Sequence, residues 1–255
     1  MNRGNRSGRG CLILLAVLVL LETFSVLGWA ENIRVHPATL KIEGFFGGTR
    51  LRVSGDIPEG TEAVIEVIGT EAEQELMRKG RLWDLWMNVG EIDIKGVPGF
   101  YLIASSDPKL LSASTAEKPW GYGLWRRSAR FQGAFKQGEE ALIFQEFLQL
   151  KEGKGLYGRF PGVVKVVSVG GGRDQAQATF PINTRIAPGT YHVRLTAVRG
   201  QHVVQSTQIP WQVKMAGSPA FLTFLAMKRP VLYGILAVGL AVVVGFLSGL
   251  LFKKR

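Results

Sequence analysis

The chain has 255 residues, 46% of them hydrophobic, and a formal net charge of +11. This length allows one or two domains besides any membrane segments. The single cysteine, Cys11, excludes an intramolecular disulfide and a cysteine-based metal site. Because much of the positive charge lies at the two ends of the chain, we interpret it as a membrane-topology signal and expect no nucleic-acid partner.

Residues 1–30 have the pattern of a secretory signal peptide. Three arginines within the first nine residues precede an apolar stretch, Cys11–Leu21, and a small-x-small pattern ends at Ala30. Cleavage after Ala30 and retention as an anchor both remain open, and Glu22 favours cleavage because a carboxylate in lipid is costly. In either case the arginines predict that the next segment is exported.

Residues 31–222 are predicted to form a mainly β outer domain, an immunoglobulin-like sandwich. Short runs alternate apolar and polar residues between Gly and Pro turns, as at residues 49–60. The polar stretch at 71–79 is expected to be a connection, with a helix as one option. Near the end of the domain, Tyr191 follows Gly189-Thr190, a pattern that predicts a tyrosine corner with a hydroxyl group bonded backward to the chain.

Residues 107–155 interrupt the strand pattern and are predicted to be a helical insertion in the sandwich. From Gly138 onward the apolar residues Ile143, Phe144, Phe147 and Leu148 form one stripe of a helix. Glycines at 153 and 155 are expected to end this helix.

The segment from Val231 to Phe252 contains no charged residue and is long enough to cross a bilayer as a helix. The basic tail at 253–255 fits a cytoplasmic end. These features predict a single-pass protein of the bacterial inner membrane, with the lipid bilayer as a partner and the main domain in the periplasm.

Motifs for catalysis, for nucleotide binding and for metal binding are missing from the sequence. We therefore assign no catalytic residue, no cofactor and no metal ligand. His192 and His202 are expected to face each other across the last hairpin, but two imidazoles are too few for a typical zinc site.

Several tryptophans and arginines are candidates for an interaction surface. Trp86 and Asn88 are expected on the wetter face of a strand, unless the helical insertion covers that face. A second aromatic and basic cluster contains Trp120, Trp125, Arg126 and Arg127. It fits either an anionic membrane surface or, for the tryptophans, ordinary core packing.

The last helix carries small residues at every fourth position, Ala237, Ala241, Gly245 and Gly249. Such a row permits close approach of a second membrane helix. We call it the small-residue ridge and expect it to contact a second copy of the chain or another membrane protein.

A set of short segments in a fixed order carries a family resemblance. The segments are Arg78-Lys79-Gly80, Trp86-Met87-Asn88, Val97-Pro98-Gly99-Phe100-Tyr101, Gly155-Leu156-Tyr157, Pro188-Gly189-Thr190-Tyr191 and Tyr233-Gly234. With them the chain resembles a family of alphaproteobacterial transmembrane proteins that have a signal, an outer domain and one C-terminal span. The resemblance covers residues 31–255. Because its members tend to be encoded beside permeases of the sulfite-exporter type, it implies a permease as a partner, and it brings no catalytic residues.

These observations favour a membrane-anchored periplasmic binding or accessory protein that assists an inner-membrane anion exporter. The alternative is a periplasmic solute-binding or enzymatic domain with its own pocket. A deep cleft that gathers polar groups with perturbed pKa values would favour the alternative.

Overall fold

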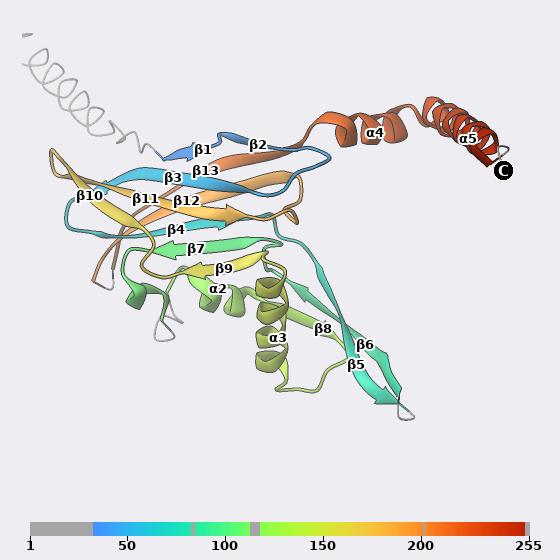
Figure 1. Ribbon diagram of the computed structural model, residues 1–255. Helices are drawn as coiled ribbons and strands as arrows, with labels where there is room; N and C mark the ends of the chain where they lie inside the picture. The colour runs from blue at the N-terminus through green and yellow to red at the C-terminus, as the bar shows by residue number, and fades with distance from the viewer. Residues whose placement is uncertain (1–32, 83–84, 113–117, 201, 253–255) are drawn as a thin grey trace, which may run out of the picture. The chain divides into compact units, whose positions relative to one another are not determined.

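The computed structural model describes residues 33–82, 85–112, 118–200 and 202–252. The predicted signal at 1–30 and the predicted tail at 253–255 lie outside these residues. Within the described residues the chain is mainly β, and its strands form three sheets (Figure 1).

The first sheet has four antiparallel strands in the order β1-β3-β11-β10. These strands are β1 (Arg34–His36), β3 (Thr49–Pro58), β11 (Arg173–Ile182) and β10 (Lys165–Gly170). The turn between β10 and β11 is Gly170-Gly171-Gly172, and all three glycines have positive φ, which glycine adopts without a steric penalty. This triplet therefore forms the tight turn of the β10–β11 hairpin.

The second sheet has six strands in the order β2-β13-β12-β4-β7-β9. Their bounds are β2 (Thr39–Ile42), β13 (His202–Met215), β12 (Gly189–Arg199), β4 (Glu62–Ile68), β7 (Tyr101–Ser105) and β9 (Tyr157–Phe160). The outer strands β2 and β9 pair in parallel with their neighbours, and the four central strands are antiparallel.

The main hydrophobic core lies between these two sheets. It joins residues of β3 and β11, such as Leu51 and Phe180, with residues of β12 and β13, such as Val193 and Trp211, and all four are buried. Successive residues of a strand point to opposite faces of its sheet, so each sheet turns one apolar face toward the other, as in a β-sandwich. The predicted β-sandwich is confirmed. The immunoglobulin-like assignment stays a prediction, and the order of the strands supports it.

Tyr191 lies at the start of β12, as the Gly-x-Tyr pattern predicted. Its hydroxyl group donates a hydrogen bond to the carbonyl oxygen of Ala187 at 2.8 Å, four residues upstream. The backward hydrogen bond of the tyrosine corner is thus confirmed.

A third layer covers the other face of the six-stranded sheet and has its own hydrophobic core. It contains β5 (Gln74–Leu82), β6 (Leu85–Lys95), β8 (Arg130–Gly133), the 3-10 helix η2 (Pro108–Leu111), α2 (Gly121–Ser128) and α3 (Glu140–Gly153). The stripe predicted on α3 is confirmed, because Ile143, Phe144 and Phe147 are buried and Leu148 is half-buried. The expected connection at 71–79 is wrong, since most of it is strand β5.

Two helices end the described chain. The helix α4 (Gly217–Lys228) follows β13 directly, and α5 (Pro230–Phe252) follows after Arg229, whose backbone is not helical. The apolar side chains of α5 from Val231 to Leu250 are exposed to solvent in the isolated chain. By length and composition, α5 is the one candidate membrane span among the described residues.

Candidate functional site

The most unusual polar group of the described chain is the carboxyl of Glu66, which lies at the centre of the six-stranded sheet. Residues on β4 alternate, so Ile65 and Val67 enter the main core while Val64, Glu66 and Ile68 face the third layer. Glu66 is fully buried, and its cross-strand neighbours are Ile103 on β7 and Arg194 on β12.

Three groups surround this carboxyl. The hydroxyl of Tyr101 donates to Glu66 Oε1 at 2.5 Å, and Arg194 Nη1 lies 3.4 Å from Oε2. The same tyrosine hydroxyl accepts a hydrogen bond from the backbone N–H of Gly121 at 2.8 Å. Burial raises the pKa of the Glu66 carboxyl above its ordinary value, although the Tyr101 hydrogen bond and the Arg194 charge lower it in part.

Aromatic rings enclose the Tyr101 side chain. Its centroid lies 5.5 Å from the ring of Trp125, 6.0 Å from Tyr122 and 5.9 Å from Tyr157. The contacts of Tyr101 with Trp125 and Tyr157 are edge-to-face, a favourable arrangement for aromatic rings, and the contact with Tyr122 is tilted. Burial and the neighbouring Glu66 raise the pKa of Tyr101 well above its usual value, so its hydroxyl stays protonated at neutral pH.

An open groove lies outside these rings, and the Tyr157 ring is part of its lining. It has a volume of about 480 Å³ and is lined by Leu111, Glu152, Tyr157, Gly158, Arg159 and Pro161. On its rim the Tyr122 hydroxyl donates to Glu152 Oε1 at 2.8 Å, and Arg159 stacks on the Tyr122 ring with 4.9 Å to its centroid. Glu152 and Arg159 form a loose ion pair of 3.8 Å, and both are partly exposed.

Lys151 on α3 is a second buried charged group beside this groove. Its Nζ donates to Gln74 Oε1 and to the carbonyl oxygen of Gly99, and it faces the rings of Phe147 and Tyr157. Burial, with a contribution from the charge of Lys154, lowers the pKa of Lys151 to about 8.

This arrangement suits binding better than acid–base catalysis. Glu66 and Tyr101, both with raised pKa values, are fully buried behind the aromatic rings. At the groove, burial also raises the pKa values of Tyr122 and Tyr157, so these phenols stay protonated at neutral pH, and Arg159 and Glu152 are paired with each other. A general base must reach the proton that it removes, and a fully buried carboxyl does not. A small polar molecule or a peptide side chain could contact Arg159 at the rim.

The comparison with family models decides the family. The model described as "Putative transmembrane protein (Alph_Pro_TM)" matches residues 32–254. The chain belongs to this family. No curated protein matches the chain. As a member of Alph_Pro_TM, it is a transmembrane protein with α5 as its candidate span, which confirms the resemblance seen in the sequence.

The structure separates the predicted interaction residues of this Alph_Pro_TM chain. Trp120 is 2% exposed and its Nε1 donates to the carbonyl oxygen of Leu110. Of the two alternatives for this tryptophan, it therefore packs in the core and is not part of an exposed contact surface. Trp125 is half-buried against Tyr101. Arg126 stacks on Phe131 and Phe144.

The remaining predicted residues lie nearer to solvent. Arg127 is exposed and donates to the carbonyl oxygen of Lys118, and Asn88 is exposed on β6. The backbone of Trp86 belongs to β6, but its side chain lies outside what the structure describes. On α5 the small-residue ridge, Ala237, Ala241, Gly245 and Gly249, is exposed, and open space surrounds Gly245 and Gly249.

The two histidines do not face each other as expected. His192 on β12 lies opposite Pro210, and His202 lies opposite Arg199 at the start of β13. The hairpin is long, so residues near its two ends are far apart along the strands. Elsewhere, carboxylate oxygens of Glu75, Glu91 and Asp93 on the β5–β6 hairpin lie within 4.8 Å of one another. Clusters of solvent-accessible acidic groups are common in proteins without a bound ion, so this cluster alone does not define a metal site.

Sequence reasoning missed Glu66, Tyr101 and Lys151. One signal was available for Glu66, because it is the only charged residue in the apolar run Ala63–Ile68. A charge within an otherwise continuous buried strand indicates a partner somewhere in the fold. Its partners lie 35 and 128 residues away in the sequence, and the sequence pattern does not identify them.

Proposed function

We propose that this protein is a membrane-anchored binding protein whose outer, periplasmic domain works with an integral partner in the bacterial inner membrane. Membership of a transmembrane family and the single candidate span support the anchor. The family resemblance described for the sequence implies an anion-exporting permease as the partner.

The polar groups with perturbed pKa values favour this proposal over a domain with its own reaction site. Such a site would gather them in a deep cleft. Here Glu66, Tyr101 and Lys151 are buried, and the Tyr157 phenol that lines the groove is held protonated by its raised pKa. The groove beside Arg159 and the pocket beside Phe45 are both open to solvent and not deep clefts.

One observation carries the proposal, namely the hairpin formed by β5 and β6. Strand β8 pairs only with Ile92–Lys95 at the base of this hairpin. From the pair Arg78–Gly90 to the pair Leu82–Leu85, the two strands pair with each other and with no other described strand. We call this outer part the hairpin arm.

A two-stranded arm needs support from elsewhere. An isolated two-stranded hairpin is marginally stable in water, and its free edges offer unpaired N–H and C=O groups to another chain. The arm also contains Arg78, Lys79, Arg81 and Trp86, and arginine and tryptophan are enriched where proteins contact each other strongly. We therefore place the partner contact on this arm.

Site-specific photo-crosslinking in native membranes tests the contact. A photoreactive residue at Asn88, which is exposed on β6, should form an adduct with a multi-spanning membrane protein. The matched control is the same residue at Gln177, which is exposed on β11 in the four-stranded sheet. Adducts from position 177 and none from position 88 would refute the assignment.

A shortened hairpin gives a second test. Replacing residues 78–90 by Asn-Gly joins Met77 to Glu91, which the register already pairs, through a turn suited to hairpins. The domain should stay folded by circular dichroism and lose its partner. Replacing Gly170-Gly171-Gly172 by Asn-Gly should change neither property.

The alternative, a solute-binding domain, rests on the groove with Arg159. It predicts that Arg159→Ala abolishes binding of a small anion such as sulfite, measured by calorimetry on the full-length protein. No heat of binding in the parent protein would exclude it.

A further inference from the structure

One phenylalanine stands out from the surface in the loop between β2 and β3. Phe45 is 104% exposed, whereas its neighbour Phe46 is half-buried against the main core. The Phe46 N–H donates to the carbonyl oxygen of Glu43 at 3.1 Å, so Gly44 and Phe45 are the two central residues of a tight turn. The turn that buries Phe46 thereby presents Phe45 to the outside.

The base of this loop is fixed to the sandwich. Gly48 has a φ of +93°, and a Cβ atom there would lie 2.8 Å from the carbonyl oxygen of Ile182. Glycine is therefore required for the close approach of the loop to β11. A ring held out on an anchored turn suggests a contact that lies outside the isolated chain.

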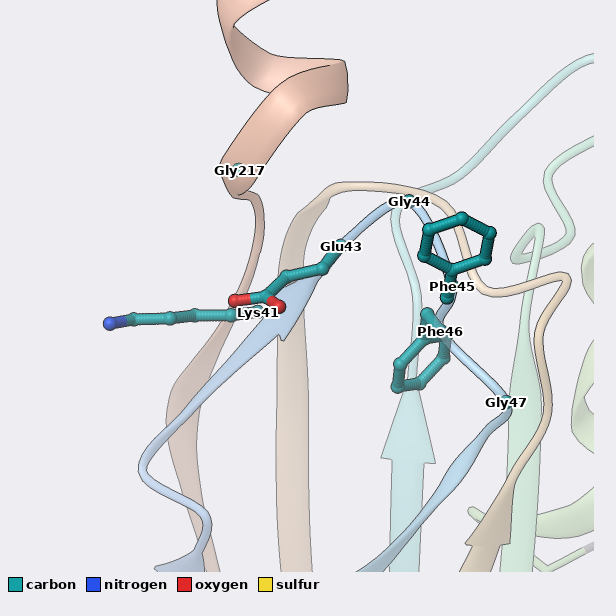
Figure 2. A pocket seen from close by; sticks show the side chains of 7 residues that line it. All are labelled: Lys41, Glu43, Gly44, Phe45, Phe46, Gly47 and Gly217. Atoms are coloured by element: carbon teal, nitrogen blue, oxygen red, sulfur yellow. The ribbon is translucent and has the colours of Figure 1, made fainter.

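The loop lies at the point where the chain leaves the sandwich toward the membrane. Strands β2 and β13 run in parallel up to the pair Ile42–Met215, and the Ala216 N–H donates to the carbonyl oxygen of Ile42 at 2.9 Å. The next residue, Gly217, begins α4 and lines one pocket of about 370 Å³ together with the loop (Figure 2).

The helix α4 links this point to the span and has an apolar surface of its own. Its side chains Phe221, Leu222, Phe224 and Met227 are all more than half exposed. Lys228 ends α4, Arg229 lies between α4 and α5, and α5 is by itself long enough to cross the bilayer core. Two charged residues at that junction favour the headgroup level, so α4 belongs at the interface and not in the core.

The short length of α4 keeps the loop close to the same interface. Twelve helical residues span about 18 Å. If α4 rests on the membrane with its exposed phenylalanines, its first residue, Gly217, rests there too. Phe45, whose loop shares a pocket with Gly217, is then within reach of the lipid.

The charges around the loop match an anionic surface. Lys41 and Lys214 are register partners on β2 and β13, and both are exposed. Among the described residues neither lysine has a carboxylate within salt-bridge distance, and Glu43 is the one acidic residue that lines the pocket. Figure 2 shows the ammonium group of Lys41 at the far end of an extended side chain, directed away from both phenylalanine rings.

We propose that the Phe45 loop and α4 together form a membrane-surface contact, in which Phe45 inserts at the headgroup level of the bilayer crossed by α5. Lys41 and Lys214 then lie near anionic phospholipid headgroups. The contact holds the sandwich against the membrane at one end.

Depth-sensitive fluorescence on the full-length protein tests this contact. A Cys11→Ser, Phe45→Cys variant labelled with an environment-sensitive dye is reconstituted in vesicles of phosphatidylcholine and phosphatidylglycerol that contain spin-labelled lipid. The dye should be blue-shifted and quenched by that lipid. The matched control is Val169→Cys, which is exposed on β10 and whose dye should stay unquenched.

Two further variants separate the parts of the proposal. With the dye at Gly47→Cys, Phe45→Ser should lower the ratio of bound to free loop by roughly 10-fold, since burial of one phenylalanine side chain contributes that much. Lys41→Glu with Lys214→Glu should reduce quenching in anionic vesicles more than in phosphatidylcholine alone.

Equal quenching at positions 45 and 169 would overturn the proposal. So would a dye at position 45 that is blue-shifted but not quenched by lipid, since this would mean that protein, for example a second copy, covers Phe45.

Discussion

The carboxyl group of Glu66 and the hydroxyl group of Tyr101 form a hydrogen bond of 2.5 Å inside the third layer, with both side chains fully buried. The same hydroxyl fixes the first residue of α2, because it accepts from the Gly121 N–H. One tyrosine thus connects the centre of the six-stranded sheet to a helix of the insertion.

The first prediction concerns Tyr101→Phe. The phenyl ring retains the aromatic contacts, but Glu66 and the Gly121 N–H both lose a partner in a buried place. We expect the free energy of unfolding to fall by about 2–6 kcal/mol, because each of the two buried groups left without this partner costs about 1–3 kcal/mol. Chemical unfolding in detergent, followed by tryptophan fluorescence, measures the change.

Tyr191→Phe is the matched control for Tyr101→Phe. It removes one hydroxyl group that donates to a single carbonyl oxygen, that of Ala187. Its cost should be about 0.5–1.5 kcal/mol. If the two variants lose the same stability, the double role of the Tyr101 hydroxyl is wrong.

The second prediction concerns the pH dependence that Glu66 brings. Its pKa is raised in the folded state from an ordinary value of 4.5, so above that value the folded state holds the proton more tightly than the unfolded state. The protonated Glu66 carboxyl therefore stabilises the folded state at low pH, and this contribution to the free energy of unfolding declines as the pH rises through the folded-state pKa.

Glu66→Gln removes this titration. The free energy of unfolding of the variant minus that of the parent should increase as the pH rises from about 4 to 7. If the substitution also changes stability by a pH-independent amount, this difference in free energy moves up or down at every pH, but its slope against pH stays the same. A difference that is flat or that falls with pH would contradict the raised pKa.

The third prediction concerns Lys151, for which the sign is opposite. Its pKa is lowered from 10.5 to about 8 in the folded state, so between these values the unfolded state binds more protons. Stability should rise with pH across this window. In Lys151→Met this contribution should be missing, whereas in Lys154→Met, at an exposed position, the rise should largely remain.

Local patterns predicted the elements whose cause is local. The stripe of Ile143, Phe144 and Phe147 identified α3, and the Gly-x-Tyr pattern identified the Tyr191 hydrogen bond. The span was evident because a bilayer imposes a length and a composition on any crossing helix.

Features that depend on pairing between distant segments were not predictable in this way. Gln74–Lys79 is polar and reads as a connection, but pairing with β6 makes it a strand. The Glu66 site forms only when β4, β7, α2 and β12 come together. Phe45 is exposed because its neighbour Phe46 is the phenylalanine that packs against the core. Single-sequence periodicity carries no information about such partners.

The fourth prediction concerns topology. From the arginines near the N-terminus and the two apolar runs, we predict that residues 31–227 lie in the periplasm and Arg255 in the cytoplasm. A reporter enzyme that is active only in the periplasm should be silent when fused after Arg255 and active when fused after Met227. Strong activity after Arg255 would reverse the orientation.

The fifth prediction concerns the small-residue ridge on α5. Membrane helices gain little from apolar contact with each other, since lipid is equally apolar, and they associate where small residues allow the backbones to approach. Gly245 and Gly249 have the spacing known for such contacts, and no described side chain occupies the space beside them. Gly245→Leu with Gly249→Leu should preserve insertion, because both changes add apolar surface, and should weaken crosslinking to the partner helix.

A matched change on another side of the same helix controls for the added bulk. Gly239 lies six residues before Gly245, which places it about 120° away around the helix. Gly239→Leu should therefore leave crosslinking unchanged, while Gly245→Leu alone reduces it. Two differently tagged copies of the chain in one cell distinguish self-association from contact with a permease. If the double variant associates as well as the parent, the ridge is not the interface, and the contact must come from the outer domain, where the hairpin arm is the next place to examine.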